Sequence, residues 1–159
     1  MRAGKIGSDL SIEPGDPTDA PVRALIAHLD AYLHALYPTE NNYLVPVDSL
    51  RGPDAVFLVA RLGAEVIGCG ALVDRASQYG ELKRMVVRPD CRGSGVGRAI
   101  LAALTAQARA RGLRAVKLET GTAQPEALAL YERAGFRRCA AFGGYREDPL
   151  NVFLQLDLG

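Results

Sequence analysis

The sequence predicts a single mixed α/β domain, and three observations indicate it. The chain has 159 residues, which is about the length of one domain and short for two separate cores. Its apolar residues alternate between strand-like and helix-like spacing. A predicted hairpin is followed by a strand, helix, strand, helix and strand, and such crossover helices make at least two neighbouring strands parallel.

The chain is predicted to open with a strand and a long helix. Residues 10–13 form a short strand candidate. Apolar residues follow helical spacing over residues 19–37, with Asp19 available as the N-cap and Pro21 in the first turn. This spacing predicts an amphipathic helix.

A loop and a hairpin are expected next. Residues 38–53 mix prolines, asparagines and charges, which predicts a loop with one helical turn over residues 47–50. Residues 55–61 and 65–73 are rich in β-branched and apolar residues and flank a short turn, so they are predicted to pair as a hairpin.

The second half is predicted to hold four strands and two helices, with glycines and prolines at their ends. Pro89 ends the first of these strands, and Gly112 and Gly135 end the helices. The strands cover residues 80–88, 114–119, 136–140 and 151–157, and the helices cover residues 96–111 and 125–134.

The near-neutral net charge hides an uneven distribution. The formal net charge is +1, but the segment from residue 81 to residue 114 holds eight basic and two acidic residues, a local charge of +6. The remainder carries −5. This concentration suits a compact polyanion, although arginines such as Arg109 and Arg111 also fit a solvated helix surface. With 6% aromatic residues, the chain is not expected to bind nucleic acid.

The composition favours a cytoplasmic protein. No apolar run approaches the length of about 18 residues that a membrane span requires, so no membrane association is expected. Residues 1–9 contain no apolar stretch behind a charged start, and no secretory signal is predicted there. The three cysteines are widely spaced and odd in number, which favours a reducing compartment over a disulfide framework.

A glycine-rich loop between a strand and a helix is the most specific feature. Glycines there let the backbone turn its N–H groups toward one point, and the helix N-terminus adds partial positive charge, so the loop is suited to a phosphate or pyrophosphate. A Walker loop is excluded because the required lysine is missing, and a dinucleotide fingerprint lacks its third small residue. A turn needed only for its geometry is the alternative. The predicted site comprises Arg92, Gly93, Ser94, Gly95, Val96, Gly97 and Arg98.

Two motifs resemble those of the GNAT superfamily of N-acetyltransferases. The loop resembles the signature Gln/Arg-x-x-Gly-x-Gly/Ala, which in that family binds the pyrophosphate of acetyl-coenzyme A (acetyl-CoA) through backbone amides. Residues 127–136, ALALYERAGF, resemble the family's helix that carries a tyrosine and ends in Gly-Phe. The resemblance covers at least residues 81–136.

This resemblance implies the family's fold and its co-substrate. The expected fold is a three-layer α/β (α+β) domain over residues 1–159, with a mixed twisted sheet of six or seven strands and helices on both faces. Its acetyl-CoA-binding core spans about residues 81–138, where the fourth and fifth strands splay to admit the pantetheine arm. Homodimers are common in the family, so a homodimer is one expectation.

The resemblance also implies roles for individual residues. Tyr131 occupies the place of the tyrosine that gives a proton to the departing sulfur; a tyrosine merely packed at the helix rim is the alternative. Glu81 is the candidate general base, or only an ion-pair partner of its basic neighbours. Backbone groups of residues 85–87 are expected to meet the pantetheine. Gln124 stands where many members have a cofactor-contacting asparagine, a departure from the pattern. The residues of that strand are Met85, Val86 and Val87.

The acceptor is expected between the loop after the first helix and the C-terminal hairpin. Candidate contacts there are Tyr37, Glu40, Asn41 and Tyr145, with a solvated loop as the alternative. The leading hypothesis is acetyl transfer to a small-molecule amine in a ternary complex. The alternatives are a protein N-terminal or lysine acetyltransferase, and a coenzyme A binding module without transferase activity. No metal site is predicted, since the two histidines lie six residues apart on one helix and face different sides.

Overall fold

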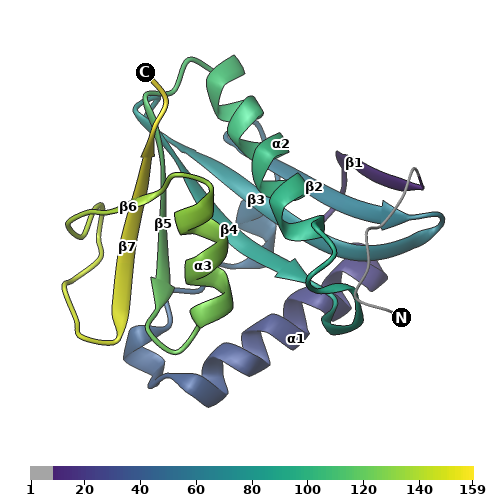
Figure 1. The fold of residues 1–159 in the computed structure, drawn as a ribbon, viewed down its shortest axis with the longest axis horizontal. Coiled ribbons are helices and arrows are strands. Elements are labelled where there is room, and N and C mark those ends of the chain that lie inside the picture. The colour runs from purple at the N-terminus through teal and green to yellow at the C-terminus, as the bar shows by residue number, and fades with distance from the viewer. Residues whose placement is uncertain (1–8) are drawn as a thin grey trace.

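A seven-stranded sheet lies between helices in the computed structural model, which describes residues 9–159 (Figure 1). No secretory signal is predicted in residues 1–9, and of these only Asp9 is among the described residues. The sheet order is β1-β2-β3-β4-β5-β7-β6. Its strands are β1 (Leu10–Pro14), β2 (Ala55–Leu62), β3 (Glu65–Arg75), β4 (Tyr79–Val87), β5 (Ala115–Gly121), β6 (Arg137–Arg138) and β7 (Asn151–Asp157).

The strand pairing is antiparallel except at one place. β4 and β5 are parallel, and within residues 9–159 every other pair of neighbouring strands is antiparallel. The prediction that crossover helices create parallel neighbours is therefore confirmed. The observed sheet also agrees with the expected mixed sheet of six or seven strands.

Helices cover both faces of the sheet, as expected. They are α1 (Ala20–Leu36), α2 (Val96–Ala110) and α3 (Pro125–Arg133), with single 3-10 turns at Thr39–Asn41, Val47–Leu50 and Pro89–Cys91. Alternate residues of β2 separate the two layers: Phe57 and Val59 pack with α1, while Leu58 and Ala60 pack with α2 and α3. Two cores therefore hold the sheet, one on each face.

Two sequence predictions differ from the structure in detail. Asp19 precedes α1, but its carboxylate makes no capping hydrogen bond, and its backbone carbonyl accepts from Arg23 instead. The strand predicted over residues 136–140 is only the two residues of β6, because Phe142 folds back against Phe153, with ring centroids 5.9 Å apart. In the described part of the chain, no helix is long and apolar enough to cross a membrane.

The basic residues of the segment 81–114 do not form one positive patch. The local charge of +6 therefore does not act as a whole on a polyanion. Arg88 pairs with Glu65 and Asp90, and Arg111 lies 3.6 Å from Asp74. Two further basic residues, Lys83 and Arg84, are buried. The exposed Arg92 and Arg98 remain beside the glycine loop.

Candidate active site

The cleft begins where β4 and β5 separate. The two strands pair only over three residues, the last pair being Glu81 with Lys117. A bulge then interrupts the pairing of β4 with β3, and Arg84 within it has a φ of 51°, a rare conformation for a residue other than glycine. A bulge bends its strand, so β4 is directed away from β5. Beyond it, no ladder pairing joins β4 to β5 in the described chain.

The separated edge of β4 carries the residues predicted to meet the pantetheine. Met85 lines the cleft, whereas the side chain of Val86 is buried in the core beside α1. The side chain of Val87 packs partly against the opposite core. On the side facing β5, the backbone groups of this segment have no ladder partner and can therefore pair with an extended ligand.

The glycine loop lies at the end of β4 and opens onto α2. Gly93 has a φ of 78° and Gly95 a φ of 91°, and a Cβ atom built on either would meet no atom within 4 Å. Gly95 is the N-cap of α2, and the first intrahelical bond runs from Ala99 N to Gly95 O. The N–H groups of the first turn before Ala99 therefore have no helical acceptor. An open loop above such amides fits an anion such as pyrophosphate.

Side chains beside the loop fix its position. Arg92 is exposed and donates from Nε to the carbonyl oxygen of Val87 at 3.3 Å, which ties the loop to the free end of β4. The hydroxyl of Ser94 donates to the carbonyl oxygen of Cys91. Gly97 lies inside the first turn of α2, where a Cβ would contact Leu130 at 3.4 Å. The loop is thus anchored to the end of β4 and to α3.

Tyr131 projects from α3 to the wall of the cleft. It is buried, lines the cavity between β4 and β5, and packs edge-on against Phe136 with ring centroids 5.6 Å apart. Burial raises the pKa of the Tyr131 phenol well above its usual value. The phenol therefore stays protonated and can donate its hydrogen to a group in the cleft.

Tyr37 and Gln124 are brought into direct contact at one end of the cleft. The Tyr37 hydroxyl donates to Gln124 Oε1 at 3.2 Å and accepts from the backbone N–H of Ala123 at 3.1 Å. Gly121 permits this approach, because a Cβ there would lie 1.8 Å from the hydroxyl oxygen. The Thr120 hydroxyl also lies 3.4 Å from Gln124 Oε1, so this oxygen is already engaged.

Asn41 is part of the site and Glu40 is not. The buried Asn41 donates from Nδ2 to Asn151 Oδ1 at 2.7 Å and accepts from Asn151 Nδ2 at its carbonyl oxygen. Asn151 in turn donates to Glu119 Oε2 at 2.7 Å. Glu40 is exposed and does not line the cleft, so its expected contact with the acceptor has no geometric support.

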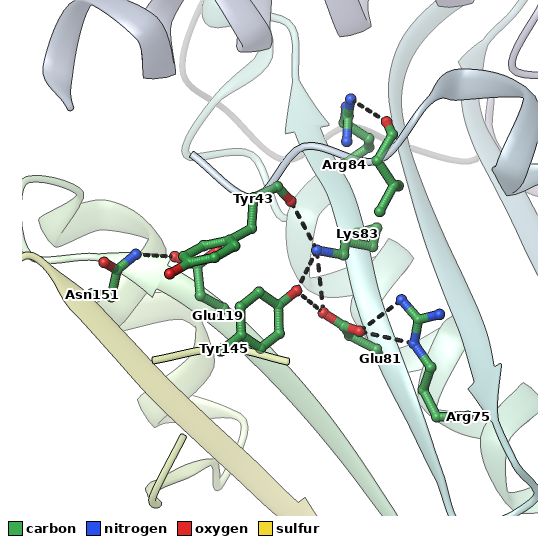
Figure 2. A network of polar contacts seen from close by, with 9 residues as sticks. Tyr43, Arg75, Glu81, Lys83, Arg84, Glu119, Tyr145 and Asn151 are labelled. Atoms are coloured by element: carbon green, nitrogen blue, oxygen red, sulfur yellow. Dashed lines mark hydrogen bonds and ion pairs between the residues drawn. The ribbon is translucent and has the colours of Figure 1, made fainter. Parts of the chain in front are cut away.

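Glu81 lies at the centre of a charged network rather than alone (Figure 2). Its Oε1 is 2.9 Å from both Arg75 Nε and Arg75 Nη2, and its Oε2 is 3.2 Å from Lys83 Nζ. The Tyr145 hydroxyl donates to the same Oε2, and Lys83 also donates to the carbonyl oxygen of Tyr43. Both oxygens of Glu81 are therefore engaged. The ion pair with Lys83 agrees with the alternative interpretation, in which Glu81 pairs with a basic neighbour.

Glu119 is the acidic residue that the sequence analysis missed. Burial raises its pKa to about 7, and the nearby charge of Glu81 adds to the rise. The hydrogen bond from Asn151 and the charge of Lys83 act in the opposite direction. Glu119 lines the same cavity as Tyr131. A carboxyl group with a pKa near neutrality is suited to exchange protons there.

A signal for Glu119 was present in the sequence. It lies near the end of the predicted strand over residues 114–119, next to the strand that leads into the glycine loop. The carboxyl ends of parallel strands meet at one edge of a sheet, which is where ligands bind in α/β folds.

Arg84 has a structural role, since its guanidinium pairs with Asp30 at 3.0 Å and donates to Val45 O at 2.8 Å. These contacts hold α1 and the following loop over the cleft.

Comparison with known proteins is consistent with this geometry. The model of the acetyltransferase (GNAT) family matches residues 22–136. The chain is 44% identical to the IAA acetyltransferase of Azospirillum brasilense over 151 residues, which cover 94% of this chain and 99% of that protein. It is 33% identical to the uncharacterized N-acetyltransferase YsnE of Bacillus subtilis, with 86% of this chain and 93% of YsnE covered.

Solved structures share the whole fold. A Klebsiella pneumoniae protein assigned as an acyl-CoA N-acyltransferase superposes with a TM-score of 0.81 at 38% identity, covering 96% of this chain and all of the other. A GNAT family acetyltransferase of Elizabethkingia anophelis, solved with acetyl-CoA bound, has a TM-score of 0.67 at 18% identity and covers 96% of this chain and 100% of its own. At that identity the resemblance concerns the fold alone.

Proposed function

The chain belongs to the acetyltransferase (GNAT) family, and we propose that it transfers the acetyl group of acetyl-CoA to the amine of a small molecule. The observation that carries this proposal is the cleft between β4 and β5, which Glu119 and Tyr131 line from different elements. In the overall reaction, the amine nitrogen bonds to the carbonyl carbon as the carbon–sulfur bond breaks, and the products are an amide and the free thiol.

The residues present fit acetyl-CoA. The open loop at Gly93 and Gly95, with the free amides at the start of α2, would hold the pyrophosphate, and Arg92 and Arg98 would add positive charge beside it. The unpaired edge of β4 at residues 85–87 would hydrogen-bond the pantetheine arm. Gln124 would contribute less, since its Oε1 is already hydrogen-bonded within the protein.

Glu119 is our candidate for the general base. An alkylammonium acceptor must lose a proton before its nitrogen can form a bond, and an ionised carboxylate in the cleft can take that proton. A pKa of about 7 leaves Glu119 largely ionised just above neutrality while keeping it basic enough for the transfer. Glu81, the earlier candidate, has both oxygens held by Arg75, Lys83 and Tyr145, which favours a supporting role.

Tyr131 is our candidate for the proton donor. Its raised pKa keeps the hydroxyl protonated, so it can donate a hydrogen to the departing sulfur. Complete transfer from a phenol to an ordinary thiolate is uphill, because a free thiol has a pKa of about 8.5. Burial also raises the pKa of a thiol beside the phenol, which narrows the difference between the pKa values of the phenol and the thiol.

A small acceptor is supported by the cover over the cleft and by one relative. Tyr37, Asn42 and Tyr43 line the cavity from the segment after α1, leaving less space for a peptide backbone. The relative at 44% identity is described as an IAA acetyltransferase, which favours a small molecule for this chain as well. A peptide N-terminus or lysine remains the competing acceptor, and coenzyme A binding without transfer the competing activity.

Release of free thiol from acetyl-CoA, measured with a panel of small amines, amino acids and short peptides, tests the proposal. We expect turnover with at least one small amine and a kcat/KM for peptides at least tenfold lower. A preference for peptides would support the protein acetyltransferase instead. Binding of acetyl-CoA without turnover on any acceptor would contradict the proposal and favour the binding module.

A further inference from the structure

A second cavity lies beside the cleft, on the side of the C-terminal loop. Its volume is about 530 Å³, within the range of small-molecule sites. It shares Tyr43, Leu44 and Lys83 with the cleft that Glu119 and Tyr131 line, so the two cavities are neighbours. An acceptor with its amine in the cleft would reach the second cavity past Lys83.

Aromatic rings form much of the wall of this cavity. Tyr43 and Tyr145 meet edge to face with ring centroids 4.7 Å apart, and Tyr79 also lines the space. Gly144 lines it too, and a Cβ built there would meet no atom within 4 Å. Flat rings and an uncrowded glycine leave room for the body of an organic acceptor.

The polar wall of this cavity carries an excess of positive charge. Two cations, Arg75 and Lys83, pair with the single carboxylate of Glu81. The side chains of Glu81 and Lys83 are 3% and 8% exposed and pair with each other, whereas Arg75 is 39% exposed. The excess positive charge therefore lies at Arg75, where a ligand of opposite sign can compensate it.

Arg75 has donors left for such a ligand, and Lys83 does not. The three hydrogens of Lys83 Nζ are directed to Glu81, Tyr145 and the carbonyl oxygen of Tyr43. Arg75 engages Glu81 through Nε and Nη2 only, and one terminal nitrogen is turned away from Glu81 (Figure 2). Its side chain is 39% exposed and lines the cavity. No further partner of this guanidinium is found within residues 9–159.

We propose that Arg75 binds a carboxylate of the acceptor, so that the acceptor is an amine that also carries a carboxylate several bonds away from the nitrogen, as in an ω-amino acid. This inference rests on the proposed function and specifies its substrate class. The planar guanidinium can hold a carboxylate through two parallel hydrogen bonds while it keeps its contact with Glu81. The acceptor's ammonium would then lie toward Glu119 in the cleft and its carboxylate toward Arg75 in the second cavity, with its chain passing Lys83.

Matched pairs of acceptors test this inference in the full-length protein. Thiol release would be measured for 5-aminopentanoate against pentylamine, 6-aminohexanoate against hexylamine and 8-aminooctanoate against octylamine. We expect kcat/KM to be at least tenfold higher for the carboxylate member of the pairs that turn over. If no amine reacts, the proposed function fails together with this inference. If amines react without preference for the carboxylate, only this inference fails.

Substitution of Arg75 assigns the preference to a residue. In Arg75→Gln the ratio of kcat/KM within a pair should fall to nearly one, and in Arg75→Lys it should fall part of the way. The ratio is the readout because it cancels any loss caused by freeing Glu81. Arg137, whose exposed guanidinium pairs with Asp157 at 2.8 Å, provides the control. Arg137→Gln should keep the wild-type ratio, and an unchanged ratio in Arg75→Gln would overturn the assignment.

Discussion

At the scale of single residues, the environment of each side chain decides its chemistry. Glu81 and Glu119 carry the same carboxyl group, but Glu81 is held by two cations and a phenol, whereas the partly buried Glu119 has a hydrogen bond from Asn151. The first arrangement supports neighbouring groups, and the second produces a pKa near neutrality. The proposed division between support and proton transfer follows from this difference.

Glu119→Gln should lower kcat by about 10²- to 10³-fold, as expected for loss of a general base. In the wild-type enzyme, kcat should rise with pH through an apparent pKa of about 7 as Glu119 ionises. Steady-state thiol release between pH 5.5 and 9 should show this limb, and the variant should lack it. Glu126, exposed at the start of α3, is the matched control, so Glu126→Gln should keep both rate and profile. A limb that persists in Glu119→Gln would contradict the role.

The same substitution should change how stability depends on pH. The pKa of Glu119 is about 7 in the folded state against 4.5 for an unperturbed glutamate, so the folded state holds the proton more tightly. The resulting stability is fully present below about pH 4.5 and is lost as pH rises through 7. Glu119→Gln should thus be more stable than wild type at pH 8, by about 1–3 kcal/mol, and nearly equal at pH 4.5. Urea unfolding at both pH values measures this; a variant that is less stable at pH 8 would show that the carboxylate is not destabilising.

Tyr131→Phe should lower kcat by about 10²-fold and leave the KM for acetyl-CoA within about twofold. The ring and its contact with Phe136 remain, and only the hydroxyl is lost. Steady-state kinetics with acetyl-CoA as the varied substrate separates the two quantities. Tyr32, which is exposed on α1, supplies the control Tyr32→Phe. Equal kcat in Tyr131→Phe and wild type would remove the proton-donor role.

At the scale of elements, α2 has a glycine with positive φ at each end, and only the one at its start is proposed to bind acetyl-CoA. Gly95 precedes the helix with a φ of 91° and Gly112 follows it with a φ of 72°, and a Cβ on either would meet nothing within 4 Å. A side chain at either position should therefore cost about 1–2 kcal/mol of backbone strain. Gly95→Val should also weaken acetyl-CoA binding at least tenfold, whereas Gly112→Val should not. Calorimetric titration with acetyl-CoA compares the two; equal affinities would contradict the pyrophosphate site.

The sequence predicted elements well where the information is local. Helical spacing predicted α1, α2 and α3 nearly to their ends, and the hairpin of β2 and β3 followed from its composition. The glycine loop was found because positive φ values require glycine at Gly93 and Gly95. The strand predicted over residues 136–140 is longer than β6. Local spacing does not reveal where this strand ends, because the packing of Phe142 on Phe153 joins residues that are separated in the sequence.

At the scale of the whole molecule, the site depends on contacts between distant segments. Asn41 and Asn151 are 110 residues apart in sequence and hydrogen-bond beneath Glu119, and Tyr145 reaches Glu81 across 64 residues. No periodicity or motif encodes such pairings, so the sequence identified Glu81 and its neighbour Lys83 but not its partners Arg75 and Tyr145, and it passed over Glu119. A homodimer and a cytoplasmic location stay predictions from the sequence.

Hydrogen exchange of the whole chain with and without acetyl-CoA tests the central claim most directly, namely that the cleft between β4 and β5 is the acetyl-CoA site. Saturating acetyl-CoA should slow exchange in peptides covering residues 85–87 and 93–98, where backbone amides face the cleft and the start of α2. Exchange in the exposed segment at the other end of α2, residues 109–112, should not change. Protection elsewhere without any in these two segments would contradict the claim.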